Sequence, residues 1–109
     1  CILLLGVAYK PNVDDMRESP ALDVIHLLQA SGAEVCYHDP YIPAFDHDGI
    51  SMESLPDLMP AVEKADCTVI ITNHKDYDYD EILNAANLIV DTRNGLGDMG
   101  KNHPKVVRL

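Results

Sequence analysis

Apolar positions along the chain form two alternating patterns, short mostly apolar runs and longer amphipathic stretches. A short apolar run without regular polar alternation is typical of a strand that helices bury on both faces. Such runs predict strands at residues 2–7, 34–38, 67–71, 88–90 and 105–109, with one further short edge strand near residue 50. Amphipathic stretches predict helices from Pro20 to just before Gly32, between Asp57 and Ala65, and from Asp78 to Ala86.

The first of these helices has the clearest boundaries. Ser19 is a favoured N-cap residue, Pro20 suits the first helical position, and Gly32 follows the last turn. Its apolar residues repeat at the spacing of one helix face, namely Ala21, Val24, Ile25 and Leu28. Asp78 can cap the last helix, where the acidic first turn suits the positive end of the helix dipole.

Strands that alternate with helices indicate right-handed crossovers and a parallel sheet. We therefore predict an α/β fold, a three-layer α/β/α Rossmann-like doubly wound sheet with strand order 3-2-1-4-5-6, in which strand 3 is short. Ligands of such sheets bind outside the carboxyl ends of the strands, where the order reverses. Here that point lies between predicted strands 1 and 4.

Size and charge narrow the class of protein. The 109 residues suit a single domain, and 47% hydrophobic content is ordinary for a globular chain. A net charge of −10 argues against nucleic acid and anionic membrane surfaces as partners. No apolar run approaches the roughly 20 residues of a membrane span, so we expect a cytoplasmic protein. Because the chain begins at Cys1 within an apolar run, we expect a fragment of a longer polypeptide.

Cationic side chains are scarce, yet several are predicted near one crevice. Lys10 and Arg17 follow predicted strand 1 and Arg93 follows strand 5, and together they are three of the eight Lys and Arg residues. Phosphate is the natural ligand of such a group, and Tyr9 could stack on a ring or donate a hydrogen bond. Surface pairing of Lys10 and Arg17 with nearby acidic residues is the alternative.

Other kinds of site have weaker support. Gly6 stands without the further glycines of a dinucleotide fingerprint, so any ligand is bound through side chains. The three cysteines have no metal-site or disulfide spacing. His38, Asp39, Asp46, His47 and Asp48 lie close in sequence but match no metal-ligand pattern. His74 follows a strand at the ligand end, although a structural role is favoured, and no residue is nominated as catalytic.

Four segments together resemble the C-terminal domain of the UDP-glucose/GDP-mannose dehydrogenase family. They are Gly6-Val-Ala-Tyr-Lys10, Asp14-Asp-Met-Arg-Glu-Ser-Pro20, His38-Asp-Pro40 and Asp91-Thr-Arg93. The Tyr-Lys pair followed by Arg-Glu-Ser is the specific part, and the resemblance runs over almost the whole chain. The sequence of residues 15–22 and 38–43 is more similar to the branch of the family that acts on UDP-N-acetylhexosamines.

The resemblance implies an NAD-dependent 6-dehydrogenase that oxidises the C6 alcohol of a nucleotide sugar to a carboxylate in two hydride transfers. It implies that Tyr9, Lys10 and Arg93 contact the UDP-sugar substrate and that Arg17 reaches the NAD cofactor. It also implies that N-terminal and central domains of the same polypeptide bind most of the NAD and carry the catalytic cysteine, and that the enzyme is a homo-oligomer. The fragment alone is then expected to be inactive.

Two other classes remain open at this stage. A receiver-like signalling domain is also acidic and doubly wound, but it needs an acidic pair directly after strand 1, and Asp14 and Asp15 lie well into the loop. A non-catalytic assembly module is the other alternative. It partly agrees with the dehydrogenase interpretation because oligomers are expected there too.

Overall fold

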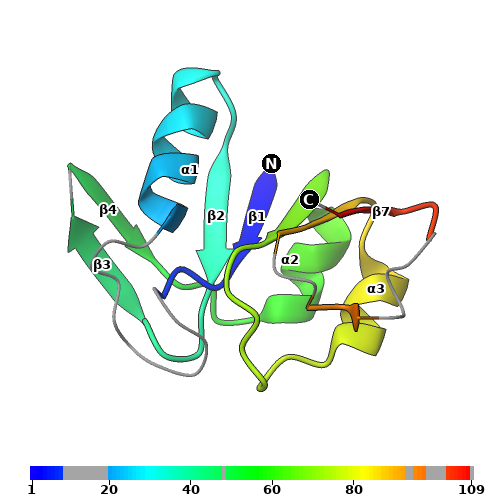
Figure 1. Cartoon of the computed structure of the whole chain (residues 1–109). Coiled ribbons are helices and arrows are strands. Elements are labelled where there is room, and N and C mark those ends of the chain that lie inside the picture. The colour runs from blue at the N-terminus through cyan, green and yellow to red at the C-terminus, as the bar shows by residue number, and fades with distance from the viewer. Residues whose placement is uncertain (9–19, 48, 93–94, 98–102, 109) are drawn as a thin grey trace.

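The computed structural model describes residues 1–8, 20–47, 49–92, 95–97 and 103–108. Within these residues the centre of the fold is a five-stranded parallel sheet of order β2-β1-β5-β6-β7 (Figure 1). Its strands are β1 (Ile2–Leu5), β2 (Val35–His38), β5 (Cys67–Ile70), β6 (Ile89–Asp91) and β7 (Val106–Arg108). Apart from strand 3, this is the predicted order 3-2-1-4-5-6, with β5, β6 and β7 as the predicted strands 4, 5 and 6. β1 and β5 are neighbours at the point where the order reverses.

The predicted short strand 3 does not join this sheet. Ile50 belongs to β4 (Ile50–Glu53), which pairs antiparallel with β3 (Ala44–His47) in a separate two-stranded sheet. A parallel partner for β2 requires a crossover of a dozen or more residues, and the segment between His38 and Ile50, part of which forms β3, is too short for one. Antiparallel strands need only a two-residue turn, and Asp48-Gly49 is a hairpin dipeptide, with Gly49 at a φ of 77°.

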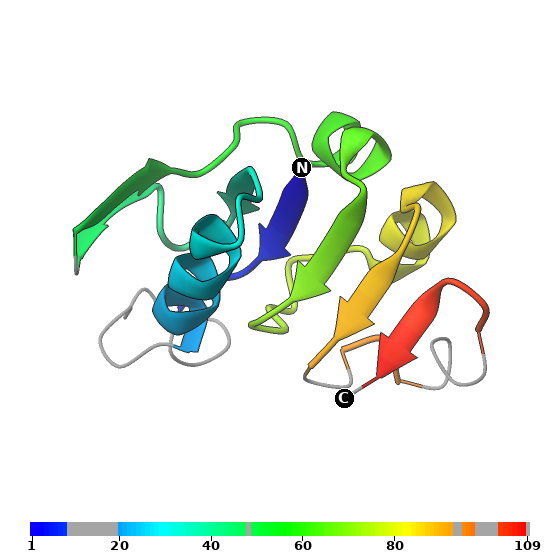
Figure 2. The same cartoon turned by 90° about the horizontal axis from the view of Figure 1, so that it is seen from above.

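Helices cover both faces of the sheet (Figure 2). α1 (Pro20–Ala30) lies on one face, whereas α2 (Leu58–Lys64) and α3 (Tyr79–Ala85) lie on the other. Leu4 of β1 packs into the core under α1, and Leu3 packs into the core under α2 and α3. This alternation gives two separate cores and confirms the predicted three-layer α/β/α arrangement.

The helix boundaries follow the sequence signals. Pro20 is the first residue of α1, as predicted, while Ser19 lies outside the described residues. Asp78 is the N-cap of α3, and its carboxylate accepts a hydrogen bond from the Glu81 amide at 3.2 Å. α2 is one continuous helix with Pro60 in its first turn, where a missing amide N–H costs no helical hydrogen bond.

Candidate functional site

The carboxyl ends of β1 and β5 lie side by side, so the residues after each strand meet at the predicted ligand edge. Gly6 has a φ of 81°, and a Cβ atom at this position would lie 2.6 Å from both the Cβ and the carbonyl oxygen of Thr72. A glycine is therefore needed where the chain leaves β1, which ends β1 at Leu5 instead of the predicted Val7. From here the backbone passes into the buried residues Val7 and Ala8.

A buried carboxylate holds these two residues. Oδ2 of Asp39 accepts hydrogen bonds from the backbone amides of Val7 at 2.8 Å and Ala8 at 3.2 Å. Oδ1 accepts the Tyr41 amide at 2.8 Å, and His74 Nε2 lies 2.9 Å from Oδ2. Asp39 is 2% exposed and His74 is fully buried. The chain thus fixes its own loop with a carboxylate that follows β2 directly.

Electrostatics agree with an ionised carboxylate at this point. Burial alone would raise the pKa of Asp39, but hydrogen bonds from His74 and from the amides of Val7 and Tyr41 outweigh burial and lower it below its usual value. An ionised carboxylate only accepts hydrogen bonds, so His74 Nε2 carries the proton of the contact between the two side chains. These contacts give His74 the structural role that the sequence analysis favoured over a ligand role.

This arrangement changes what the loop after β1 can bind. In dinucleotide-binding domains, the backbone amides that follow the first strand approach the pyrophosphate. Here the amides of Val7 and Ala8 already donate to Asp39. An internal carboxylate takes the place of an anion, and these two amides are not available to a dinucleotide.

Thr72 secures the same backbone from the β5 side. Its hydroxyl donates to the Ala8 carbonyl at 2.7 Å, and the Thr72 side chain is 1% exposed. The His74 amide in turn donates to the Thr72 carbonyl at 3.1 Å, and the Tyr79 hydroxyl donates to the His74 carbonyl at 2.9 Å. The short Thr72-Asn73-His74 segment is thereby tied both to Ala8 and to α3.

His38 and Tyr77 form a second polar contact at this edge. The Tyr77 hydroxyl donates to the His38 carbonyl at 2.6 Å, so its oxygen is the acceptor for His38 Nδ1 at 3.2 Å. Burial lowers the pKa of His38 below its usual value, and burial together with the nearby Asp39 carboxylate raises that of Tyr77. Both side chains are therefore neutral partners that fix the end of β2.

A second carboxylate plays a similar part at the end of β6. Asp91 accepts the Gly95 amide on Oδ1 at 2.9 Å and the Leu96 amide on Oδ2 at 3.1 Å, and it is 1% exposed. The next residue, Thr92, donates its hydroxyl to the Ile70 carbonyl at 2.6 Å. The segment that carries Arg93 is thus anchored on both sides by contacts with the sheet and with Asp91.

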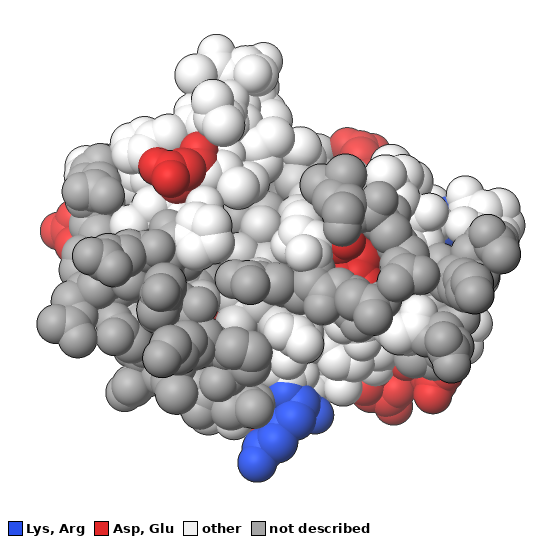
Figure 3. All heavy atoms as spheres, viewed as in Figure 1, with Lys and Arg blue, Asp and Glu red and all other residues white. Residues whose placement is uncertain are grey.

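All four predicted ligand residues, Tyr9, Lys10, Arg17 and Arg93, lie outside the described residues, as do the acidic partners considered for them. The structure describes instead the residues from which their segments start. Ala8 precedes Tyr9 and Thr92 precedes Arg93, and both follow strands whose carboxyl ends share one edge of the sheet. The face in Figure 3 carries scattered acidic side chains, and the described basic ones show chiefly at its lower edge.

Sequence reasoning did not find the roles of Asp39, Asp91 and Thr72. Asp39 was considered within a possible metal cluster and as part of a family motif, and Asp91 only as part of a family motif. The available signal is the position of each residue, since a small polar side chain directly after a buried strand can reach the backbone of the neighbouring loop. Within the described residues, no three His, Cys, Asp or Glu side chains come together as metal ligands.

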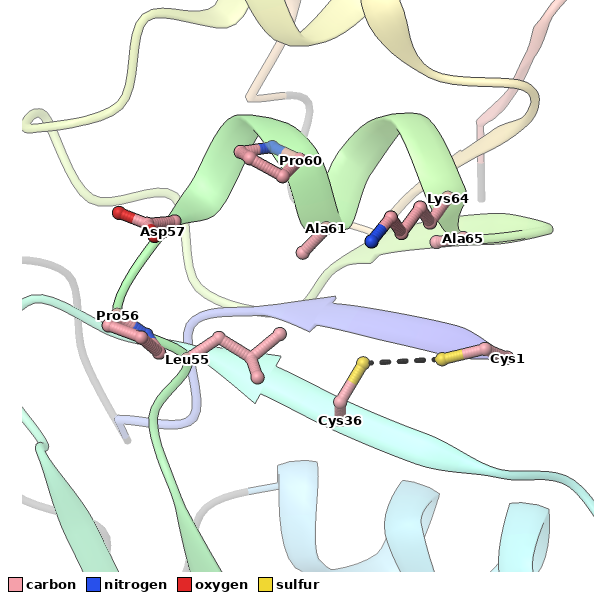
Figure 4. Close-up of a pocket in the computed structure, with 9 residues that line it drawn as sticks. All are labelled: Cys1, Cys36, Leu55, Pro56, Asp57, Pro60, Ala61, Lys64 and Ala65. Atoms are coloured by element: carbon pink, nitrogen blue, oxygen red, sulfur yellow. Dashed lines mark hydrogen bonds between the residues drawn. The ribbon is translucent and has the colours of Figure 1, made fainter.

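A pocket of about 290 Å³ lies elsewhere, between α2 and the strands β1 and β2 (Figure 4). Its lining is mostly apolar and consists of Cys1, Cys36, Leu55, Pro56, Asp57, Pro60, Ala61, Lys64 and Ala65. The thiols of Cys1 and Cys36 lie 3.4 Å apart on the side formed by β1 and β2, and burial raises the pKa of Cys36 (Figure 4). Because Cys1 precedes β1, this pocket includes the amino end of the strands and is distinct from the ligand edge.

None of the described helices combines the length and apolar character that crossing a membrane requires.

These features define a Rossmann-like α/β domain whose ligand edge is organised by its own carboxylates. Residues 3–98 match the model of the UDP-glucose/GDP-mannose dehydrogenase family, UDP binding domain. The chain belongs to this family, as its sequence motifs indicated.

Individual relatives also match most of the chain. The chain is 40% identical over 101 residues to the UDP-N-acetyl-D-mannosamine dehydrogenase of Methanocaldococcus jannaschii, which covers 85% of this chain and 22% of that protein. It is 38% identical over 101 residues to the UDP-glucose 6-dehydrogenase of Rhizobium meliloti, covering 85% of this chain and 23% of that protein. The chain therefore spans less than a quarter of the length of these relatives.

Among solved structures, the UDP-D-ManNAc dehydrogenase of Pyrococcus horikoshii superposes with a TM-score of 0.73 at 29% identity, covering 98% of this chain and 24% of that one. A GDP-mannose dehydrogenase from Pseudomonas aeruginosa superposes with a TM-score of 0.72 at 21% identity, which shows the shared fold.

Proposed function

We propose that residues 1–109 form the C-terminal, nucleotide-sugar-binding domain of an NAD-dependent UDP-sugar 6-dehydrogenase. The observation that carries this proposal is the match of residues 3–98 to the UDP binding domain of the family. In the whole enzyme the C6 alcohol of the sugar is oxidised to a carboxylate in two hydride transfers. The catalytic residues belong to the N-terminal and central domains of the same polypeptide, so this domain alone is inactive.

Within this domain, Tyr9, Lys10 and Arg93 bind the UDP part of the substrate. Lysine meets a phosphate as a point charge and arginine as a two-pronged donor, and each such contact contributes about 1.5–3 kcal/mol when partly desolvated. Support comes from the anchored positions of Ala8 and Thr92, directly before these segments, at one edge of the sheet. Both segments start where substrates of doubly wound sheets bind.

The described residues do not fit a complete NAD molecule. The amides that would contact its pyrophosphate donate to Asp39. NAD is therefore bound mainly by the upstream domains, and Arg17 alone reaches it from this chain. When bound, NAD accepts the hydrides from the sugar, whereas this chain binds and orients the nucleotide.

Among substrates we propose a UDP-N-acetylhexosamine, since the Methanocaldococcus jannaschii relative is a UDP-N-acetyl-D-mannosamine dehydrogenase. We further propose a cytoplasmic homo-oligomer. A receiver-like role is disfavoured because a receiver needs an accessible carboxylate after a strand. The described carboxylates in that position, Asp39 and Asp91, are buried and accept hydrogen bonds on both oxygens.

The test is turnover by the complete enzyme that contains this domain. NADH formation is measured with UDP-N-acetylmannosamine, UDP-N-acetylglucosamine, UDP-glucose and GDP-mannose, and we expect two NADH per sugar with one of the UDP-N-acetylhexosamines. Absence of turnover with every sugar overturns the proposed function, and preference for UDP-glucose overturns only the substrate. NADH formation by residues 1–109 alone overturns the assignment of catalysis to the upstream domains.

A further inference from the structure

The backbone of Val7 and Ala8 is held by side chains from two other strand ends. Asp39 follows β2, and Thr72 and His74 follow β5. Asp39 accepts the amides of both residues, while Thr72 donates to the carbonyl of Ala8. Ala8 is the last residue before Tyr9 and Lys10. The two backbone amides and the Ala8 carbonyl at the start of the proposed ligand segment are therefore all held by hydrogen bonds.

We propose that Asp39, Thr72 and His74 are positioning residues for UDP binding, which clamp the backbone of Val7 and Ala8 and so fix the point from which the chain continues to Tyr9 and Lys10. This inference rests on the proposed function. It gives the Thr72-Asn73-His74 segment a role that neither the fold nor the family match assigns.

Burial supports a clamp that is formed before the ligand arrives. Val7, Ala8 and His74 are fully buried, and Asp39 and Thr72 are nearly so, so no solvent rearrangement is needed to form these bonds. Backbone that is already fixed next to a binding site lowers the cost of ordering when the ligand binds, and here Val7 and Ala8 are fixed in this way. The clamp therefore acts on affinity for the nucleotide.

His74 also makes the carboxylate compatible with a nearby diphosphate. An isolated carboxylate beside an anion site would repel the ligand. Around Asp39 the donors include the His74 imidazole at 2.9 Å in addition to backbone amides. His74 thus holds Asp39 turned towards the protein, where its charge is compensated by N–H groups.

The sharpest test compares two threonines of similar burial. Thr72→Val removes the hydroxyl that donates to Ala8, whereas Thr68→Val changes a threonine of β5 whose Oγ1 is buried without a hydrogen-bond partner among the described residues. The two substitutions are chemically identical and nearly isosteric. In the complete enzyme we expect Thr72→Val to raise the KM for the UDP-sugar and the Kd for UDP about tenfold, while kcat changes less than about twofold.

Thr68→Val is the control and is expected to keep the KM of the unmodified enzyme, because it loses no hydrogen bond. Thr72→Ser is the conservative variant and is expected to rescue most of the affinity that Thr72→Val loses, because it retains the hydroxyl. For the histidine, His74→Phe is expected to raise KM about tenfold, and His74→Gln is expected to restore most of the affinity because its amide N–H can still reach Asp39. The exposed His26→Gln controls for loss of an imidazole.

Thermal unfolding is measured for every variant alongside UDP affinity. Equal KM values for Thr72→Val and Thr68→Val overturn the inference, and so does an equal fall of kcat at unchanged KM in Thr72→Val and His74→Phe. An unmodified complete enzyme that neither binds UDP nor oxidises a UDP-sugar overturns the proposed function instead, so the two failures are distinguishable.

Discussion

Gly6 and Thr72 approach so closely that a Cβ atom on Gly6 would lie 2.6 Å from the Thr72 Cβ. The contact joins the end of β1 to the residues after β5, at the point where the sheet order reverses. It explains why the chain has a glycine after β1 although no dinucleotide fingerprint follows. The glycine serves the packing of two loops against each other.

Gly6→Ala is therefore expected to destabilise the domain by about 3 kcal/mol, since strain at positive φ adds to an overlap with buried atoms. Gly32→Ala is the matched control, because Gly32 also has a positive φ, 87°, but its Cβ would meet nothing within 4 Å. That change should cost only about 1 kcal/mol. Urea unfolding of both variants measures the difference, and equal losses would show that the contact with Thr72 has no energetic weight.

A second prediction concerns the buried carboxylate of Asp39. Asp39→Asn is expected to lower the free energy of unfolding at pH 7 by about 3 kcal/mol, because it breaks a buried, fully hydrogen-bonded pair with His74. Folding lowers the pKa of Asp39. The ionised carboxylate therefore stabilises the fold fully at a pH above the usual pKa of 3.8, and this stabilisation is lost as the pH falls through the lower pKa of the folded state.

The difference between the unmodified domain and Asp39→Asn should therefore shrink when urea unfolding is repeated below about pH 3.8. Asp23→Asn, at an exposed position of α1, gives the baseline for removing one carboxylate. A gap that stays constant from pH 7 to pH 3 would contradict the ionised, hydrogen-bonded state of Asp39.

The N-caps of α2 and α3 provide a third, internally controlled prediction. Asp78 and Asp57 are both aspartates at N-cap positions, yet only Asp78 accepts a hydrogen bond from the helix, from the Glu81 amide. Asp78→Ala should cost about 1 kcal/mol of stability, because it removes the cap hydrogen bond. Asp57→Ala should cost only a few tenths of a kcal/mol, because Asp57 interacts with its helix only through the helix dipole. Thermal unfolding of the two variants under one condition tests this order, and a larger loss for Asp57→Ala would be inconsistent with the cap geometry.

Local signals in the sequence predicted most of the fold. The apolar run of β1, the Pro20 start of α1 and the cap at Asp78 each depend on residues close in the chain, and each is confirmed. The β3–β4 hairpin also had a local signal, the Asp48-Gly49 dipeptide, but the polar character of residues 44–53 concealed it. Apolar and polar residues do alternate in β4, Ile50 to Glu53, but a pattern of four residues is at the lower limit for recognising a strand.

The clamp on Val7 and Ala8 could not be predicted in the same way. Its bonds to Asp39 span 32 and 31 residues, and the contact between Asp39 and His74 spans 35. Which residues meet at such separations depends on the order and register of the strands. A local sequence pattern does not specify these. The neighbouring carboxyl ends of β1 and β5 were predicted correctly, whereas the side chains that organise this edge depend on long-range contacts.

The last prediction addresses the four side chains assigned to the ligands. In the complete enzyme, Lys10→Ala and Arg93→Ala should each raise the KM for the UDP-sugar by tenfold or more, because each removes a charge-assisted contact with the diphosphate, worth about 1.5–3 kcal/mol. Tyr9→Phe should have a smaller effect if the ring alone contacts the nucleotide. Arg17→Ala should instead raise mainly the KM for NAD.

Lys64→Ala, on α2 beside the pocket at the other end of the strands, is the control for loss of one cation and should leave both constants unchanged. Steady-state kinetics with each substrate varied in turn separate the two groups of residues. Unchanged KM values for the sugar in both Lys10→Ala and Arg93→Ala would remove the phosphate site from this edge. A rise in the KM for the sugar in Arg17→Ala, without one for NAD, would move Arg17 to the substrate site.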